Sequence, residues 1–450
     1  KLASKNFLSS LDTSSEEFLH ILEIAKNLER EDLIIGVQGN SKVRVNFIPS
    51  KPLDAKNAVL PIMAAALMVK GNCKITRVPR LKDTFTMIQL MEIIGAKCDF
   101  TDNTLLVNGD NIDNPEAPYE LVKTMRASFY VLGPLISRFG YVKVSLPGGC
   151  AWGPRPVDFH LKALEKLGAK ITLKGGYILA EARRLIGCKI VLDFPSVGAT
   201  GNILMAASTA RGQTIISNAA REPEISQLCR YLNKMGANIS GIGTTNLVIN
   251  GVEKLNASNI EVIPDRIEVG TFLAAGALLG KIKLNNLNPK HLTNVLQQLK
   301  KAGCHIEETS NSLIITKANS IKPLNIETEV YPGFPTDLQA QWISIMILAN
   351  GKSKVTDNVY YDRFSHVPEL NRFGANIKLK KNTAHIQGVK EIIGAPVMST
   401  DIRASASLVI AGLAAKGKTE INRVYHIDRG YENIEDKFRQ IGADIWREKS

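Results

Sequence analysis

The sequence has no apolar run long enough to cross a membrane. Its longest uncharged apolar stretches, Ala58–Val69 and Ala404–Ala415, contain twelve residues each, whereas a spanning helix needs about 20. The segment Lys1–Ile21 also has no continuous apolar core before a small-residue cleavage site, so we expect no secretory signal. Together these absences predict a cytoplasmic protein that does not insert into a membrane.

The six cysteines form no C-x-x-C pair and lie 25 to 75 residues apart. This spacing excludes a zinc ribbon and a dense disulfide framework, and it favours reduced thiols in a cytosol. The seven histidines show no H-E-x-x-H or other paired ligand spacing. A G-x-x-x-x-G-K-[ST] loop and a G-x-G-x-x-G turn after a strand are also absent. We therefore expect neither a metal nor a bound cofactor.

Aromatic residues make up 6% of the chain, which leaves few side chains for stacking on nucleic-acid bases. Lysine and arginine together number 56 against 43 aspartates and glutamates, giving a formal net charge of +13. Because the basic residues are not concentrated in one run, we expect no nucleic-acid partner. The charge favours either a plain solvated basic surface or small phosphorylated ligands.

A helix end, a glycine and a strand recur six times along the chain. The six segments read MEIIGAKCDF, LEKLGAKITL, LNKMGANISG, LKKAGCHIEE, LNRFGANIKL and FRQIGADIWR. Glycine at such a place accommodates the left-handed conformation that ends a helix. The intervals between successive glycines are 73, 68, 67, 71 and 68 residues. The glycines are Gly95, Gly168, Gly236, Gly303, Gly374 and Gly442.

Each repeat also contains a second, Ala-rich helix whose small side chains allow close packing in a core. We expect these helices over Asn57–Lys70, Met125–Arg138, Ala199–Arg211, Arg266–Leu279, Leu338–Asn350 and Ala404–Lys416. With the strands that follow, the unit is β-α-β-α-β-β. Three units make a domain of ordinary size, so the sequence predicts an α/β protein of two similar globules with three repeats each.

Cations stand at the expected starts of several Ala-rich helices. Serine, threonine and aspartate there are ordinary N-caps. Lysine or arginine at a helix N-terminus opposes the helix dipole, so we expect these cations to share an anion with the helix end. If the repeats are arranged symmetrically, the helix starts face a cleft that suits a multiply charged anion. The cations are Lys56, Arg126, Arg266 and Arg403.

Two loops contain side chains of reactive types. The glycine- and proline-rich segment Ser145–Pro156 contains Cys150 and Arg155, and an arginine nearby lowers the pKa of a thiol. We interpret the other five cysteines as inert core residues. In the turn Tyr331–Asp337, the carboxylate of Asp337 is either a helix cap or a base facing the cleft, and the residues alone favour the cap.

Ten short motifs stand in order along the chain: Ala55–Ala58, Met125–Ser128, Leu146–Cys150, Arg155–Asp158, Ala219–Glu224, Pro264–Glu268, Tyr331–Asp337, His366–Leu370, Asp401–Ser407 and His426–Tyr431. In these motifs the chain resembles the bacterial UDP-N-acetylglucosamine 1-carboxyvinyltransferases of the EPSP synthase superfamily, from about Val43 to Trp446. The resemblance implies an inside-out α/β barrel with the active site between two globules. It places the first globule at 56–263 and the second at 36–55 plus 264–450.

The resemblance also implies a reaction between phosphoenolpyruvate and the 3′-hydroxyl of UDP-N-acetylglucosamine that opens peptidoglycan synthesis. Cys150 would be the acid near C3, able to form a covalent adduct with phosphoenolpyruvate, and Asp337 would receive the hydroxyl proton. Lys56, Arg155, Arg403 and Arg429 would clamp the phosphate and carboxylate. Asn57 and Val359 would touch the sugar. The UDP portion would be held by Arg126, by Arg155, Pro156, Val157, Asp158 and Phe159, and by Ser196, Val197 and Gly198.

Some residues depart from the family pattern. Leu53-Asp54 replaces the usual Ser-Gly before Lys56, and Tyr361 stands where relatives usually carry glutamate. These departures keep open the alternative of a catalytically weak paralogue that binds UDP-sugar as a regulator. A 3-phosphoshikimate enolpyruvyl transferase is a second alternative, disfavoured because that family lacks the cysteine loop. Residues 1–35 fall outside the resemblance, and we expect an extra helix similar to the opening helix of an ornithine carbamoyltransferase.

Overall fold

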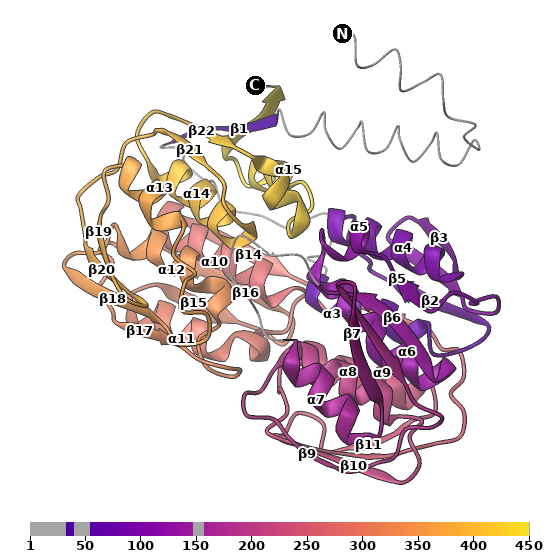
Figure 1. Cartoon of the computed structure of the whole chain (residues 1–450). Coiled ribbons are helices and arrows are strands. Elements are labelled where there is room, and N and C mark those ends of the chain that lie inside the picture. The colour runs from indigo at the N-terminus through magenta and orange to yellow at the C-terminus, as the bar shows by residue number, and fades with distance from the viewer. Residues whose placement is uncertain (1–32, 40–54, 147–156, 450) are drawn as a thin grey trace, which may run out of the picture.

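The computed structural model describes residues 33–39, 55–146 and 157–449 (Figure 1). The predicted N-terminal helix lies outside these residues. Within them, the strands form five four-stranded sheets and one three-stranded sheet. Each four-stranded sheet has one parallel pair at its edge and antiparallel pairs elsewhere. The same short pattern is therefore repeated around the molecule.

Three of the sheets follow the first part of the chain. One has the order β13(Ile260–Glu261)-β2(Asn72–Thr76)-β4(Thr104–Asn108)-β3(Lys97–Thr101). The next has the order β5(Glu116–Ala117)-β6(Tyr141–Ser145)-β8(Tyr177–Glu181)-β7(Lys170–Lys174). The third has the order β11(Asn238–Ser240)-β12(Asn246–Asn250)-β10(Gln213–Ser217)-β9(Lys189–Val191).

The other three sheets come from the later part of the chain and from β1. The three-stranded sheet is β14(Lys281–Asn285)-β16(Ser312–Thr316)-β15(His305–Glu308). It is followed by β17(Ile326–Thr328)-β18(Lys352–Asp357)-β20(Thr383–Gln387)-β19(Asn376–Lys380). The last sheet is β21(Pro396–Met398)-β22(Lys418–Asn422)-β1(Leu33–Gln38)-β23(Asp444–Lys449).

Two kinds of helix cover these sheets. The inner helices are mostly buried, four of them (α3, α8, α10 and α14) are rich in alanine, and in α3 every residue except Asn57 is buried. They are α3(Lys56–Ala66), α6(Leu132–Phe139), α8(Val197–Ala207), α10(Arg266–Leu279), α12(Gln339–Met346) and α14(Ile402–Ala414). The 3-10 helices η1(Arg126–Val131) and η3(Thr336–Leu338) lead into α6 and α12. The predicted helix Arg266–Leu279 matches α10, whereas Asn57–Lys70 and Leu338–Asn350 were predicted too long.

The remaining helices alternate with the inner ones along the chain. The helix over residues 293–301 is an example with one apolar face, because it buries Val295, Leu296 and Leu299 and exposes Lys300 and Lys301 to solvent. They are α4(Lys82–Ile94), α5(Tyr119–Val122), α7(Asp158–Lys166), α9(Pro223–Lys234), η2(Pro289–Leu292), α11(Thr293–Lys301), α13(His366–Arg372), η4(Val424–Arg429) and α15(Ile434–Gln440). None of the helices in the described residues is long and apolar enough to cross a membrane.

The six repeat glycines all end helices in the left-handed conformation. Their φ angles lie between +89° and +106°. A strand follows each of them, and these strands are β3, β7, β11, β15, β19 and β23. The repeat that the sequence predicted is therefore confirmed. One strand departs from this pattern. The edge strand β13 precedes β14 in the chain but pairs with β2, so the sheet that contains β14 has three strands instead of four.

The buried apolar residues form two separate cores. One contains residues between Ala55 and Val262, and the other contains Ile35, Val37 and residues between Ile267 and Ile445. We call the parts around them the first and the second globule. They lie side by side in Figure 1, and an ion pair between Arg429 and Asp83 joins them. The predicted domain boundary at Ile263 stays a prediction, and the two cores support it.

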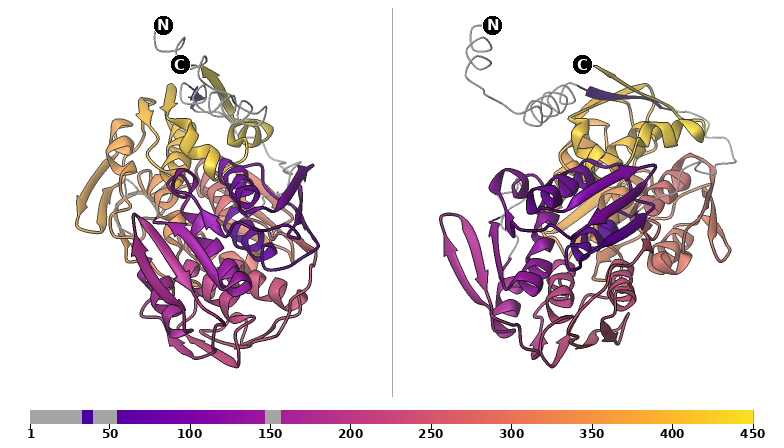
Figure 2. Two further views of the ribbon diagram at one scale, coloured as in Figure 1. Left: turned by 45° about the vertical axis from the view of Figure 1, so that its right-hand side comes forward. Right: turned by 90° about the vertical axis from the view of Figure 1, so that its right-hand side faces the viewer.

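The chain passes between the globules at two places that lie together. It goes from β1 to α3 and returns from β13 to α10. The backbone N–H of Ala55 donates to the carbonyl of Ile263 at 3.2 Å, which joins the two crossing segments. Beside β1, strand β23 brings the end of the chain into the same sheet (Figure 2).

Substitutions at Gly168 and Gly374 test the left-handed helix ends, with one glycine in each globule. Their φ angles are +93° and +89°, and an added Cβ would meet no atom within 4 Å at either position. Alanine there brings only backbone strain, so each variant should lower the free energy of unfolding by about 1–2 kcal/mol. Asparagine should cost less than alanine. Urea denaturation measures both, and equal stability of glycine and alanine variants would contradict the assignment.

Candidate active site

The starts of inner helices from both globules meet at one place. Lys56 and Asn57 begin α3 in the first globule, while Asp337 and Arg403 lie at the starts of α12 and α14 in the second. The amide of Asn57 donates to Asp337 Oδ2 at 3.5 Å. The predicted convergence of helix starts between the globules is therefore present.

Asp337 lies between two arginines. Arg363 Nη1 is 2.7 Å from Asp337 Oδ1, and Arg403 Nη2 is 3.4 Å from Oδ2. Burial opposes ionisation, but the two guanidinium groups outweigh it and hold the pKa of Asp337 well below its usual range. Its side chain caps no helix, because η3 begins after Pro335 with no side-chain cap. The interpretation of Asp337 as an N-cap is therefore wrong, and the carboxylate faces the site.

Lys56 and Arg429 share a second carboxylate, Asp83 of α4. Lys56 Nζ is 2.8 Å from Asp83 Oδ2, and Arg429 Nε of the other globule is 2.9 Å from Oδ1. Burial lowers the pKa of Lys56, and Arg429 adds to this effect while Asp83 opposes it. Burial alone would raise the pKa of Asp83, yet the charges of Lys56 and Arg429 hold it below its ordinary value. The three groups form an ion-pair bridge between the globules.

Arg266 also forms an ion pair with a carboxylate of the protein. Its Nε lies 3.0 Å from Glu224 Oε1, at the start of α9 in the first globule. The ring of Tyr331 packs on the guanidinium, 5.4 Å from its central carbon to the ring centroid. The expectation that each helix-start cation shares an anionic ligand with the helix end stays a prediction for Lys56, Arg266 and Arg403. Each is paired with a carboxylate from another part of the chain.

The segments expected to hold UDP meet around His160. An added Cβ at Gly198 would lie 3.2 Å from His160 Cε1 and Nε2, so the start of α8 touches this ring. Phe129 packs edge-on against it with ring centroids 5.0 Å apart. Arg126 is close enough to influence its charge. Burial first, and Arg126 second, lower the pKa of His160 to about 4, so the imidazole is neutral.

The tautomer of His160 follows from the contacts of Asn202. Asn202 Oδ1 accepts from the N–H of Gly133 at 2.7 Å, which fixes the orientation of the amide. Asn202 Nδ2 then donates to the carbonyl of Phe129 at 3.1 Å and to His160 Nδ1 at 2.9 Å. His160 therefore carries its hydrogen on Nε2, the atom that faces Gly198. His160 was not among the predicted site residues, although it directly follows the predicted site residue Phe159.

The other predicted residues of this region have local partners. Ser196 caps α8, with its Oγ accepting from the N–H of Ala199 at 3.3 Å. Asp158 pairs with Lys162 one turn further along α7 at 3.2 Å. Val157 and Phe159 are half-buried beside the first core. Val197 is half-buried beside it too.

Val359 is held near Asp337 by the buried Asp357. The N–H of Val359 donates to Asp357 Oδ1 at 3.1 Å. Thr336 donates to Asp357 Oδ2 at 2.7 Å and accepts from Arg363 Nη1 at 3.2 Å. The network links the predicted sugar contact to the residue next to Asp337. Tyr361, the departure from the family pattern, is 62% exposed and lies outside this network.

Cys150, Arg155 and Pro156 lie outside the described residues, as does Asp54. The other five cysteines are free thiols that are buried or half-buried. Burial raises the pKa of Cys98 and Cys229 to about 12, which supports their interpretation as inert. Among the described residues, no group of three or more His, Cys, Asp or Glu side chains could hold a metal ion.

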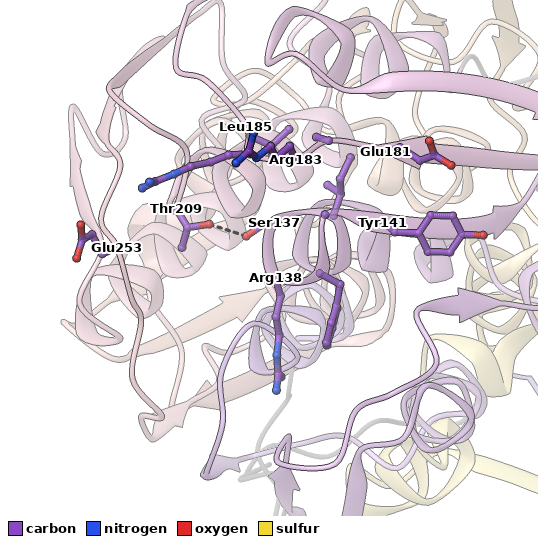
Figure 3. Close-up of a pocket in the computed structure, with 13 residues that line it drawn as sticks. Ser137, Arg138, Tyr141, Glu181, Arg183, Leu185, Thr209 and Glu253 are labelled. Carbon is purple, nitrogen blue, oxygen red and sulfur yellow. Dashed lines mark hydrogen bonds between the residues drawn. The ribbon is translucent and has the colours of Figure 1, made fainter.

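A cavity of about 670 Å³ lies on the first globule, apart from these residues (Figure 3). Ser137 and Thr209 hydrogen-bond across it at 2.8 Å. The guanidinium of Arg138 donates to the carbonyls of Leu67, Val69 and Gly109, so its hydrogen-bonding capacity serves the backbone. The residues expected in the site do not line this cavity. Its lining is Ile136–Tyr141, Glu181–Leu185, Thr209 and Glu253.

Solved enolpyruvyl transferases share this fold. NikO from Streptomyces tendae gives a TM-score of 0.83 at 23% identity, covering 93% of this chain and 99% of that one. EPSP synthase from Acinetobacter baumannii gives 0.71 at 17% identity, covering 92% of this chain and 100% of the other. At these identities the likeness concerns the fold, and it confirms the predicted inside-out α/β barrel of two globules.

Sequence relatives refine the assignment. A family model described as EPSP synthase (3-phosphoshikimate 1-carboxyvinyltransferase) matches residues 42–438. A relative from Chloroherpeton thalassium is 56% identical over 398 residues, 88% of this chain and 93% of that protein. A relative from Hydrogenovibrio crunogenus is 50% identical over 396 residues, 87% of this chain and 95% of that protein. Both are named UDP-N-acetylglucosamine 1-carboxyvinyltransferase. The chain therefore belongs to the EPSP synthase family, in its branch of UDP-N-acetylglucosamine 1-carboxyvinyltransferases, as its motifs predicted.

A double-mutant cycle tests the pairing of Asp337 with Arg363. Asp337→Asn and Arg363→Gln should each destabilise the protein, because each removes one partner of the ion pair. The double variant should recover about 1–3 kcal/mol relative to the sum of the single effects. Recovery should stay moderate because the Asp337 side chain keeps 26% of its surface exposed. Urea denaturation of all four proteins measures the coupling, and strict additivity would contradict a direct ion pair.

The low pKa of His160 should appear in the pH dependence of stability. An unfolded histidine titrates near 6.5, against about 4 in the fold. The unfolded chain binds the proton first as the pH falls, so stability is lost from 6.5 down to about 4. His160→Asn keeps an acceptor for Asn202 and should remove roughly 1–3 kcal/mol of this loss. Thermal unfolding between these limits tests it, with the 72% exposed His305 changed to Asn as control.

Proposed function

We propose that the protein transfers the enolpyruvyl group of phosphoenolpyruvate to the 3′-hydroxyl of UDP-N-acetylglucosamine and releases phosphate. The names of relatives at 50–56% identity support this proposal. The hydroxyl oxygen bonds to C2 of phosphoenolpyruvate, its proton passes to a base, and C3 gains a proton. The tetrahedral phospho-ketal then loses phosphate and a C3 proton, which restores the double bond. The product ether would enter peptidoglycan synthesis.

The arrangement around Asp337 carries the proposal. Asp337 is ionised, lies between Arg363 and Arg403, and contacts Asn57 of the other globule. A reaction that joins a hydroxyl to a doubly anionic substrate needs a base and several cations close together. Lys56 and Arg429 supply further cations beside Asp83. We infer that Lys56, Arg155, Arg403 and Arg429 bind the phosphate and carboxylate of phosphoenolpyruvate.

The charges also suggest how Asp337 becomes a base. Arg363 and Arg403 hold its pKa so low that it would accept a proton poorly. Phosphoenolpyruvate brings negative charge to the same arginines, which offsets their field and raises the pKa of Asp337. We infer that binding of this substrate activates Asp337. The hydroxyl of the UDP-sugar would then lose its proton only when its reaction partner is present.

The first globule would hold the nucleotide. The start of α8 offers the backbone N–H groups of Val197 and Gly198, the hydroxyl of Ser196 and a favourable helix dipole to a diphosphate. Arg126 adds a cation near His160. We assign the UDP portion to this surface together with the Arg155–Phe159 segment. Asn57 and Val359 would contact the sugar next to Asp337, and the acid near C3 would be Cys150.

A cytoplasmic location fits this chemistry, and the five free thiols among the described residues support it. The alternative of a 3-phosphoshikimate enolpyruvyl transferase is less well supported. The family model carries that name, but the relatives at 50–56% identity carry the name of the UDP-sugar enzyme. A regulator without turnover is the remaining alternative, and it makes a different prediction for catalysis.

Phosphate release tests the proposal. The protein should release phosphate from phosphoenolpyruvate with UDP-N-acetylglucosamine, and not with 3-phosphoshikimate. Cys150→Ser and Asp337→Asn should each lower kcat by a factor on the order of 100 or more, as loss of an acid–base group does. Cys188→Ser, at a half-buried thiol elsewhere in the first globule, is the matched control and should leave the rate unchanged.

Other outcomes would separate the alternatives. Saturable UDP-sugar binding without phosphate release would overturn the enzyme proposal in favour of the regulator. Release with 3-phosphoshikimate alone would reassign the acceptor. An acid limb in the kcat profile that disappears in Asp337→Asn would support the activation of Asp337 by phosphoenolpyruvate. A kcat profile without that limb would contradict it.

A further inference from the structure

Tyr431 joins three inner helices of the second globule through its hydroxyl. The residue directly follows the turn after η4, and its side chain is 1% exposed. Its Oη lies 3.1 Å from Arg403 Nη1 on α14, 2.9 Å from Thr271 Oγ1 on α10 and 3.3 Å from Gln341 Nε2 on α12. Thr271, Gln341 and Arg403 are themselves buried. The hydroxyl is thus sealed from solvent with three polar neighbours.

The direction of each hydrogen bond follows from the number of donors. Thr271 donates its only hydroxyl proton to the carbonyl of Ile267 at 3.0 Å, so it can only accept from Tyr431. The amide of Gln341 has two hydrogens, one for Thr271 Oγ1 at 3.1 Å and one for Tyr431. Tyr431 therefore donates to Thr271 and accepts from both Gln341 and Arg403. Burial raises the pKa of Tyr431, so the phenol stays protonated in this role.

These contacts fix the orientation of the Arg403 guanidinium. Its Nη1 is held by Tyr431, which leaves Nη2 directed to Asp337 at 3.4 Å. The ring of Tyr431 also packs against the guanidinium, 5.4 Å from its central carbon to the ring centroid. Without the hydroxyl, a buried N–H of Arg403 would lose its acceptor, and the guanidinium could turn to find another.

We propose that Tyr431 is a positioning residue, which aims Arg403 at Asp337 and at the phosphoenolpyruvate bound beside it. The inference rests on the proposed function for the identity of that substrate. It extends the site to a residue that touches neither substrate. Thr271 and Gln341 serve as the anchor, because they hold the Tyr431 hydroxyl to α10 and α12. Through Tyr431, the packing of three inner helices thereby fixes the orientation of the Arg403 guanidinium.

The test compares two buried tyrosines. Tyr431→Phe keeps the ring and removes the hydroxyl. The matched control is Tyr231→Phe in the first globule, where the hydroxyl of an equally buried tyrosine donates to the carbonyl of Ser258 at 3.2 Å. We expect Tyr431→Phe to lower kcat/KM for phosphoenolpyruvate about 10- to 100-fold, mainly through KM, as loss of a hydrogen bond to a charged group does. KM for UDP-N-acetylglucosamine should stay unchanged.

Two further measurements distinguish positioning from folding. Thr271→Val, which removes the anchor, should change KM for phosphoenolpyruvate in the same direction by a smaller factor. Thermal unfolding of all variants shows whether a loss of stability explains the kinetics. A Tyr431→Phe protein that matches Tyr231→Phe in both KM values would overturn the proposal. A fall in kcat with both KM values unchanged would also overturn the proposal, because it would indicate that a smaller fraction of the protein is active.

Binding measurements separate this inference from the proposed function. Calorimetry gives the Kd of phosphoenolpyruvate for the wild type, Tyr431→Phe and Tyr231→Phe without requiring turnover. If the wild type binds phosphoenolpyruvate but releases no phosphate, the proposed function fails, while weaker binding by Tyr431→Phe alone still supports positioning. Equal Kd values in all three proteins would overturn it. A wild type that binds no phosphoenolpyruvate overturns both.

Discussion

Repulsion between like charges is the constraint on which this site depends. The folded chain gathers Lys56, Arg363, Arg403 and Arg429 around the meeting point of its globules, and each is paired with a carboxylate placed between them. Asp83 and Asp337 take those positions. Because Asp83 joins cations of both globules, the electrostatic balance also sets how the globules approach each other. The same balance makes the site sensitive to the charge of any molecule that enters it.

The architecture explains why the charges meet. Alanine-rich helices pack closely enough to lie inside each globule, and their starts emerge at its surface facing the other globule. Side chains at those starts, such as Asn57 and Asp337, then reach across the boundary. The cavity of Figure 3 lies away from this meeting point, and there Ser137 pairs with Thr209 while Arg138 donates to backbone carbonyls.

Features encoded by neighbouring residues could be predicted from the sequence, and features that depend on distant pairs could not. The six glycines ended helices as expected, because the left-handed turn is a local property of glycine. The cations at the helix starts could also be identified in the sequence. Their partners Asp83 and Glu224 were not, since an acidic residue in the first turn of a helix is common and gives no signal of its own. The residues alone favoured a cap for Asp337 for the same reason, whereas the family motif placed it in the site, and the catalytic roles given to Asp337, Cys150 and Arg155 stay predictions.

The pairing of β1 with β22 and β23 has a consequence for biosynthesis. β1 leaves the ribosome before everything else that the structure describes, whereas its two partners are the last strands made. Ile35 and Val37 are fully buried in the folded protein. During nearly all of translation they therefore remain exposed to solvent or bound to chaperones. The first globule, whose elements are contiguous, can form in that interval. The second globule closes around a strand that was made before the first, so its assembly is the late and vulnerable step.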